Sequence, residues 1–172
     1  MCRDAYGSVL FIDEAYSLYR GDGYSTVDYG REAIDTLIAE MENHRSDLVV
    51  IMAGYTDEMN NLMKANAGLE SRMPYIIEFP NYTREQLCDI FMLMVKKNFK
   101  YQEGFEGAVK DYFESLPDEV VQSKEFSNAR FVRNLFERTW GKAVLRAQLN
   151  KEDSSILTKE DFLLASSEKE FK

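Results

Sequence analysis

Two adjacent acidic residues follow the first apolar run of the chain. In the stretch GSVLFIDEAYSLY, which starts at Gly7, hydrophobic residues lead directly into Asp13 and Glu14. A carboxylate after a buried strand lies where open α/β sheets bind ligands, and Asp13 is suited to hold Mg²⁺, which takes few protein carboxylates. Glu14 is suited to polarise a water for attack on a terminal phosphate. Acids at strand ends also cap helices, so the pair alone leaves both interpretations open.

Two arginines extend the phosphate hypothesis. Arg72 lies in GLESRMPYIIEFP, just before a third apolar run, and Arg130 lies in EFSNARFVRNLF, near the start of a predicted helix. A guanidinium binds phosphate bidentately and keeps its charge. The alternative for Arg72 is a solvated charge in an exposed turn. The alternative for Arg130 is a stem that covers the apolar face of its own helix.

Other polar features are weaker candidates for a site. His44 is the single histidine, so histidine-based metal binding and a Ser-His-Asp mechanism are nearly excluded, and we expect an ordinary residue at a helix end. The loop 19–30 has neither dinucleotide nor calcium-loop spacing, and we expect a surface loop. Arg138, Lys142 and Arg146 recur every four residues, which favours a solvated helix face, paired in part with local acids.

Composition excludes several classes of protein. The 172 residues have a formal net charge of −9, which argues against a general affinity for nucleic acid or an anionic membrane. Two cysteines, Cys2 and Cys88, do not make a disulfide framework. We find no basic segment followed by an apolar leader, and no apolar run long enough to span a bilayer. These features predict a soluble cytoplasmic protein without nucleic-acid or membrane partners.

Apolar runs then predict the elements that position the candidate residues. The runs at 8–13, 48–54 and 75–79 are the expected strands, and the first two are nearly continuous, as in a parallel sheet buried on both faces. Helical spacing predicts a helix within 28–44, and Thr56 is a candidate cap for a second helix that ends near residue 66. Strand–helix–strand–helix–strand indicates an α/β fold with right-handed crossovers.

The pattern changes to helices alone near Pro80. Thr83 and Gln86 have the spacing of a capping box at the start of an amphipathic helix. Further helices are expected near 105–116, from about Asn128 to Asn150, and near 158–168. The chain therefore divides into an α/β part, residues 1–80, and an all-α part, residues 81–172.

Four motifs in one order add a family to this interpretation. VLFIDEAY, VVIMAGY, GLESRMPYIIEFPNY and SNARFVRN together closely resemble the AAA+ ATPases of the CbbX and stage V sporulation protein K group, which includes the red-type rubisco activase. The likeness extends from about Gly7 to Asn150. It implies a partial AAA+ parallel sheet with helices, followed by an all-α lid domain. An unrelated α/β protein whose acids only cap helices is the disfavoured alternative.

The resemblance assigns a role to each candidate residue. It implies that Asp13 and Glu14 are the Walker B pair, with Asp13 as the metal-binding acid and Glu14 as the catalytic one. It makes Arg72 the arginine finger, which acts on the nucleotide of a neighbouring subunit. It makes Arg130 the sensor-2 arginine of the lid.

The sensor-1 position and the phosphate-binding loop depart from the family pattern. Sensor 1 falls at Tyr55 or Thr56, where many members have asparagine, and either side chain is a candidate to orient the attacking water. The loop G-x-x-x-x-G-K-[ST] is absent from these residues, as are the aromatic pore loop and the first two strands of the family's sheet. The resemblance therefore covers the C-terminal half to two-thirds of an ATPase module.

These features predict a fragment of an ATPase that uses ATP and Mg²⁺. The full protein is expected to couple ATP hydrolysis to remodelling of an unidentified protein client, as a hexameric ring of AAA+ subunits. The isolated chain is expected to be inactive, because the residues that grip the β- and γ-phosphates are missing. The alternative is a catalytically dead adaptor or regulatory paralogue that binds AAA+ partner subunits.

The family's strand order, 5-1-4-3-2, makes a further prediction about the sheet. The missing strand 1 would lie between 48–54 and 75–79, and simple truncation would leave two hydrophobic edges facing a gap. We therefore expect 75–79 either to pair directly with 48–54 or to use a strand of a second copy.

Overall fold

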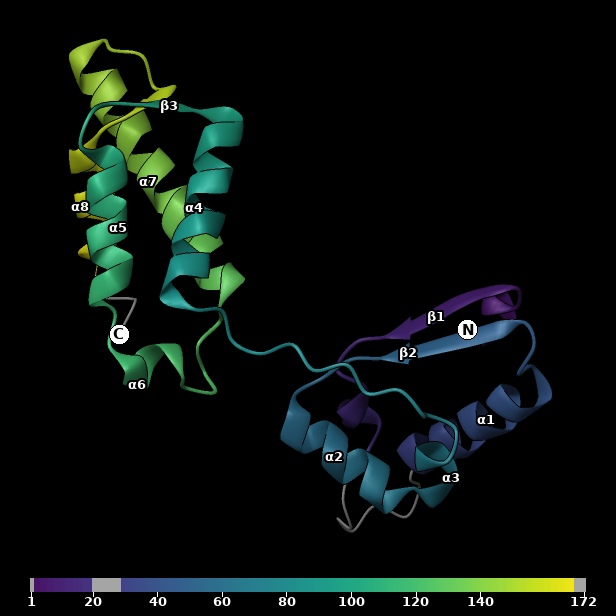
Figure 1. The fold of residues 1–172 in the computed structure, drawn as a ribbon. Coiled ribbons are helices and arrows are strands. Elements are labelled where there is room, and N and C mark those ends of the chain that lie inside the picture. Colours follow the sequence, from purple (N-terminus) through teal and green to yellow (C-terminus); the bar gives the residue numbers. More distant parts are fainter. Residues whose placement is uncertain (1, 20–28, 169–172) are drawn as a thin grey trace. The chain divides into compact units, whose positions relative to one another are not determined.

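The computed structural model describes residues 2–19 and 29–168 in two units (Figure 1). The first unit is Met1–Glu78 and the second is Phe79–Lys172. The expected surface loop at 19–30 falls mostly outside the described residues.

A two-stranded parallel sheet forms the centre of the first unit. Strand β1 (Ser8–Ile12) pairs with β2 (Leu48–Met52) in continuous register. Parallel neighbours require a crossover, and helix α1 (Tyr29–Asn43) provides it. The structure thus confirms the first two predicted strands and the helix between them.

Only one face of this sheet is buried among the described residues. Leu10 and Leu48 pack with Leu37 of α1, and the 3₁₀ helix η1 (Cys2–Ala5) adds Ala5 to the same cluster. The register places the alternate side chains of both strands on the other face, where they are exposed by 46–57%: Val9, Phe11, Val49 and Ile51. The prediction of strands buried on both faces is therefore wrong, because no described element packs on the second face.

Short helices complete the first unit after the strands. The 3₁₀ helix η2 (Ala15–Leu18) follows β1, and α2 (Thr56–Ala65) and α3 (Ala67–Glu70) follow β2. A second apolar cluster joins them to α1 through the buried side chains of Ala15, Ile34, Leu62 and Leu69. Thr56 is not the cap of α2. Tyr55 has the extended backbone of the N-cap, and no side chain bonds the first turn.

The third predicted strand is absent. Residues 74–82 form no helix or strand, and the side chains that suggested a strand are 77–91% exposed: Tyr75, Ile76, Ile77 and Phe79. A strand is stable only when a neighbour bonds its backbone. Instead of a pairing, a groove of about 580 Å³ lies against β2, lined in part by Leu48–Val50 and Ser71–Tyr75. Direct pairing of 75–79 with 48–54 is therefore wrong, and pairing with a second copy stays a prediction.

The second unit is a helical bundle, as the sequence predicts. Its first helix begins with the expected capping box: Thr83 N donates to Gln86 Oε1 at 3.0 Å, and Gln86 N donates to Thr83 Oγ1 at 3.2 Å. The helices are α4 (Arg84–Asn98), α5 (Phe105–Ser115), α6 (Asp118–Val121), α7 (Ala129–Asn150) and α8 (Lys159–Ser166). The sequence did not predict the short parallel pair of β3 (Lys100–Tyr101) and β4 (Ile156–Leu157).

Phenylalanine rings in tilted and edge-to-face contact fill the core of this bundle. Phe91 of α4 is fully buried, and its ring lies 5.3 Å from that of Phe162 and 6.0 Å from that of Phe113. Phe105 lies 6.0 Å from Phe162 in an edge-to-face arrangement. Such pairs add to the stabilisation from burial alone. The second unit therefore has an enclosed phenylalanine core, although Trp140 of the same unit is 47% exposed.

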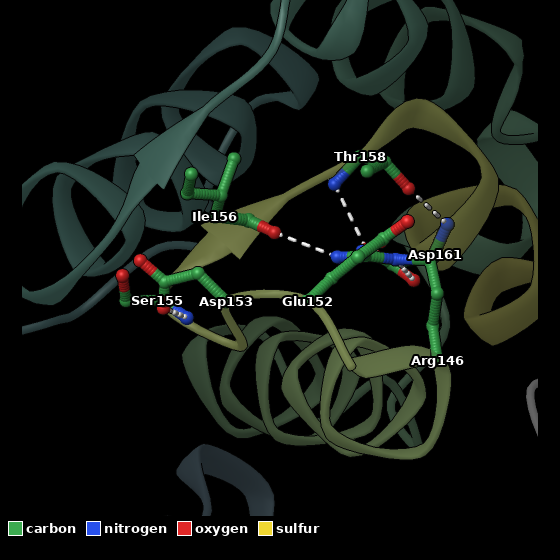
Figure 2. A network of polar contacts seen from close by, with 7 residues as sticks. All are labelled: Arg146, Glu152, Asp153, Ser155, Ile156, Thr158 and Asp161. Carbon is green, nitrogen blue, oxygen red and sulfur yellow. Dashed lines mark hydrogen bonds and ion pairs between the residues drawn. The ribbon is translucent and has the colours of Figure 1, made fainter. Parts of the chain in front are cut away.

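An ion pair joins α7 to α8 in the second unit (Figure 2). Arg146 Nε donates to Asp161 Oδ1 at 3.0 Å, and Nη2 donates to the carbonyl of Ile156 at 2.8 Å. The same arginine bonds Glu152, and the backbone N–H of Thr158 donates to Asp161 Oδ2 at 2.9 Å. Arg146 is therefore not part of a solvated face, because a buried carboxylate requires a charged partner.

Arg138 and Lys142, which recur with Arg146 every four residues along α7, also have acidic neighbours. Lys142 and Arg138 both pair with Glu168, at 2.5 and 3.5 Å. These neighbours lower the pKa of the Glu168 carboxyl, chiefly through the hydrogen bond from Lys142. The acid is therefore not local to α7 as the sequence predicts, since Glu168 lies beyond the end of α8.

Candidate functional site

The carboxyl ends of β1 and β2 bring four of the predicted residues to one edge of the sheet. Past the last ladder pair, Ala53 N donates to the Ile12 carbonyl at 2.9 Å, and Ala15 N donates to the Ala53 carbonyl at 3.0 Å. These bonds hold the turn 13–14 beside residues 53–56. Asp13 and Glu14 after β1 therefore lie at the same edge of the sheet as Tyr55 and Thr56 after β2.

Glu14 has an unusual backbone at this edge. Its φ and ψ are 47° and 43°, the left-handed region that residues other than glycine seldom occupy. Its N–H donates to Asp13 Oδ1 at 3.0 Å, and its carbonyl accepts a bond from Ser17 N at 2.8 Å. The turn thus presents two exposed carboxylates in succession. Backbone outliers of this kind concentrate at functional sites.

Asp13 fits a magnesium ion of the kind that nucleotides bring with them. Among the described residues, no group of three or more His, Cys, Asp or Glu side chains is arranged to hold a metal ion. Mg²⁺ at nucleotide sites is held by one or two carboxylates, with waters and phosphate oxygens as its other ligands. A single exposed aspartate at the sheet edge suits that coordination and does not suit a metal held by protein ligands alone.

Two residues that sequence reasoning missed shape the same edge. The ring of Tyr16 lies 6.0 Å from that of Tyr55. Partial burial and the nearby negative charge of Glu14 raise the pKa of the Tyr16 phenol. A Cβ on Gly54 would lie 2.7 Å from Tyr16 Cδ1 and 2.9 Å from Met59 Sδ. Tyr16 and Gly54 lie in the motifs VLFIDEAY and VVIMAGY. Their place in these motifs was the signal that could have identified them.

Arg72 lies away from the two carboxylates. Its Nη2 pairs with Glu42 Oε2 at 3.0 Å, and its Nη1 donates to the Gly68 carbonyl at 2.9 Å. Glu42 is at the end of α1, which leads into the start of β2, and it lines the groove with Leu48. Arg72 therefore lies toward the amino ends of the strands, whereas Asp13 lies at their carboxyl ends.

One guanidinium atom of Arg72 is incompletely satisfied. The buried Nε has no hydrogen-bond partner among the described residues, although the side chain as a whole is 30% exposed. A partly exposed ion pair is weak, so release of Glu42 costs little. The Arg72 guanidinium can therefore leave Glu42 and contact another chain.

Arg130 is the second residue of α7 in the second unit. It is exposed, and no hydrogen bond or ion pair of its side chain is seen in the described part of the chain. Its backbone N–H donates to the Ser127 carbonyl at 2.9 Å. Arg133, one turn later, lies 3.8 Å from Glu137. Of these two arginines, Arg130 has the guanidinium that is available to an anion.

His44 occupies a position at a helix end, as predicted, and has ring and acidic neighbours. Its ring stacks on Tyr6 at a centroid distance of 3.7 Å, and its Nδ1 lies 3.3 Å from Asp47. The Tyr6 hydroxyl donates to Glu40. This bond is the main cause of a raised pKa of the Tyr6 phenol. The cluster joins α1 to the start of the sheet.

Membrane insertion has no support in the described helices. In residues 2–19 and 29–168, every helix is too short or too polar to cross a bilayer.

Comparisons with known proteins agree with these elements. The family described as "ATPase family associated with various cellular activities (AAA)" matches residues 1–81, and the AAA lid domain matches residues 83–172. The first match includes the sheet and its acidic edge. The second includes every helix from α4 to α8.

Individual relatives cover most of this chain. Stage V sporulation protein K of Bacillus subtilis is 40% identical over 140 residues, which cover 81% of this chain and 42% of that protein. A CfxQ homolog of Galdieria sulphuraria is 41% identical over 164 residues, or 95% of this chain and 52% of the homolog. CbbX of Cereibacter sphaeroides is 44% identical over 135 residues, or 78% and 42%. The chain spans about half the length of these relatives.

The order of the matched parts agrees with the order of the structural units. An α/β unit with acids at the carboxyl end of β1 precedes a helical unit that matches the lid. The chain belongs to the AAA+ ATPase family, in the group of CbbX, CfxQ and stage V sporulation protein K.

Proposed function

We propose that this chain is the C-terminal part of an AAA+ ATPase module that couples ATP hydrolysis to protein remodelling. Residues 1–80 would be part of the nucleotide-binding subdomain, and residues 81–172 the lid. The observation that supports this best is the sheet edge, where Asp13 and Glu14 lie beside the end of β2. An ATPase places its metal-binding acid and its water-activating acid at such an edge.

Each side chain at the edge has a distinct proposed task. Asp13 would hold Mg²⁺, which supplies positive charge to the β- and γ-phosphates of ATP when bound. Glu14 would accept a hydrogen bond from the attacking water and draw off its proton. Tyr55 or Thr56 would orient that water, since both follow β2 beside the acidic turn.

Arg72 and Arg130 would contact nucleotide from outside the acidic sheet edge. Arg72 would serve a neighbouring subunit's nucleotide, and its position at the opposite end of the strands from Asp13 supports this proposal. Assembly into a ring, hexameric as in the resemblance, would bring it there. Arg130 would contact the nucleotide from the lid, and its unpaired guanidinium supports this role. The client protein stays unidentified, and a cytoplasmic location stays a prediction.

The isolated 172-residue chain is expected neither to bind nor to hydrolyse Mg·ATP. Its sequence has no G-x-x-x-x-G-K-[ST] loop, and its net charge of −9 repels ATP. Titration calorimetry with Mg·ATP should show no heat beyond dilution. Stoichiometric micromolar binding would contradict this expectation. In a longer polypeptide that includes the loop, Glu14→Gln should slow hydrolysis and spare nucleotide binding.

An adaptor that binds AAA+ subunits is the second candidate. The exposed apolar face of Val9, Phe11, Val49 and Ile51 favours contact with another protein surface. The DNA upstream of the first codon distinguishes the two. An in-frame G-x-x-x-x-G-K-[ST] supports the ATPase, whereas a stop codon just upstream supports the adaptor.

A further inference from the structure

The start of α7 contains a backbone conformation that asparagine seldom adopts. Asn128, the residue before α7, has φ 49° and ψ −119°. Asparagine tolerates the left-handed helical region better than most residues, but ψ here lies far outside that region, in space otherwise left to glycine. Such a conformation persists only where surrounding contacts enforce it.

The side chain of Asn128 supplies those contacts. Its Oδ1 accepts a bond from Tyr82 N at 3.1 Å, and its Nδ2 donates to Asn81 Oδ1 at 3.0 Å and to the Phe126 carbonyl at 3.2 Å. Asn81 Nδ2 in turn donates to the Val121 carbonyl at 3.2 Å. We call these contacts the Asn81–Asn128 junction. It ties the segment that enters the second unit to the residue that begins α7.

Helix capping does not explain this arrangement. An asparagine at the N-cap ordinarily accepts a bond from the N–H of the second or third helical residue. Asn128 makes no such bond, and its side chain is directed instead to Asn81 and Tyr82. Glycine would suit the backbone but would lose all three bonds, and aspartate would keep only the acceptor for Tyr82 N. Asparagine is thus the residue that satisfies every contact.

We infer that Asn128 is a positioning residue for Arg130. Asn128 O accepts the bond from Val132 N, at 3.2 Å, that starts α7, and Arg130 lies between these two residues. The direction in which the first turn of α7 leaves the junction therefore sets where the Arg130 side chain originates. A displacement of Asn81 and Tyr82 is passed to that turn. This inference rests on the proposed role of Arg130 toward nucleotide phosphate.

The test uses the 172-residue chain in solution by NMR, with Asn128→Gly as the main variant. Glycine keeps the backbone conformation and removes the side-chain bonds. We expect amide exchange at Tyr82 to accelerate at least about tenfold, and residual dipolar couplings of 129–131 to change while those of 135–148 do not. Asn128→Asp should restore part of the Tyr82 protection. Asn98→Gly, at the exposed end of α4, is the control for the substitution type and should leave both readouts unchanged.

Inorganic triphosphate serves as the phosphate probe in a second measurement. In a longer polypeptide that includes the G-x-x-x-x-G-K-[ST] loop, we expect it to shift the Arg130 Nε–H resonance and, through the junction, the Tyr82 amide. In the Asn128→Gly variant of that polypeptide, the Arg130 shift should persist, and the Tyr82 shift should be lost. No Arg130 response in the unsubstituted longer polypeptide would contradict the proposed role of Arg130. Unchanged couplings of 129–131 in Asn128→Gly would overturn the positioning inference, whatever triphosphate does.

Discussion

The two units of this protein differ in how much of their apolar surface they bury. The helical unit has an enclosed aromatic core, with Phe91, Phe105, Phe113 and Phe162 fully buried. The α/β unit has two small clusters and leaves one face of its sheet exposed. Since burial of apolar surface is the main stabilising term, the helical unit contains its own source of stability. The sheet instead presents surface suited to further contacts.

The same contrast holds for the charged groups. The Arg146–Asp161 pair lies in the interior of the helical unit, where Asp161 is only 1% exposed and all its contacts are internal. Asp13 and Glu14 are exposed at the sheet edge. This ion pair stabilises the fold of the second unit, whereas the acids at the sheet edge remain available for a ligand. The unit that is less complete as a fold therefore contains the acids that suggest catalysis.

The largest expected effect is in the aromatic core. Phe91→Ala should lower the free energy of unfolding by about 3–5 kcal/mol, because it leaves a cavity among four other phenylalanine rings. Trp140 fluorescence during denaturation by urea reports on this unit. Leu93→Ala on the same helix is the control, since Leu93 is 71% exposed and should change stability by less than about 0.5 kcal/mol. Equal losses would show that the core is not centred on Phe91.

Removal of one member of the buried ion pair comes next. Arg146→Met should cost about 3 kcal/mol, because the Asp161 carboxylate keeps its charge without its main partner. The matched control is Arg133→Met, whose exposed pair with Glu137 at 3.8 Å should be worth at most about 1 kcal/mol. Adding Asp161→Asn to Arg146→Met should recover part of the loss. Full additivity of the two changes would argue against a direct interaction.

Two glycines should respond in opposite directions to alanine. Gly54→Ala should destabilise the α/β unit by about 1–3 kcal/mol, since its Cβ would overlap Tyr16 and Met59. Gly107→Ala, in α5 with no atom within 4 Å of the added carbon, should stabilise the helical unit by about 0.5–1 kcal/mol. Far-UV circular dichroism during denaturation measures both. A stable Gly54→Ala variant would show that the AGY turn is loosely packed.

The smallest expected effect is on stability, for a substitution on the exposed face of the sheet. Phe11→Ser should change stability by less than about 0.5 kcal/mol, because Phe11 is 57% exposed. Leu10→Ala, one residue earlier and 8% exposed, should cost about 2–5 kcal/mol. Comparable losses for the two variants would mean that the face of Val9 and Phe11 is covered in solution. The contrast between the two units would then be smaller than the structure indicates.

Local patterns in the sequence determined much of this structure. Near-continuous apolar runs located β1 and β2, and helical spacing located α1, α4, α5, α7 and α8. The capping box at Thr83 depends on residues three apart and was predictable for that reason. The resemblance implied one site for Asp13, Glu14, Tyr55 and Thr56, and the parallel pairing of β1 and β2 places the carboxyl ends of both strands at one edge.

Tertiary contacts decided the features that the sequence left open or misassigned. Residues 75–79 have strand-like side chains but no strand, since a strand also needs a neighbour to bond its backbone. Arg146 has the spacing of a surface cation but pairs with Asp161, fifteen residues later. Asn128 resembles an ordinary cap but bonds Asn81 and Tyr82, 46–47 residues earlier. In each case the presence or absence of a partner far away in the sequence decides the outcome. Local periodicity does not report on such partners, so only the folded chain specifies them.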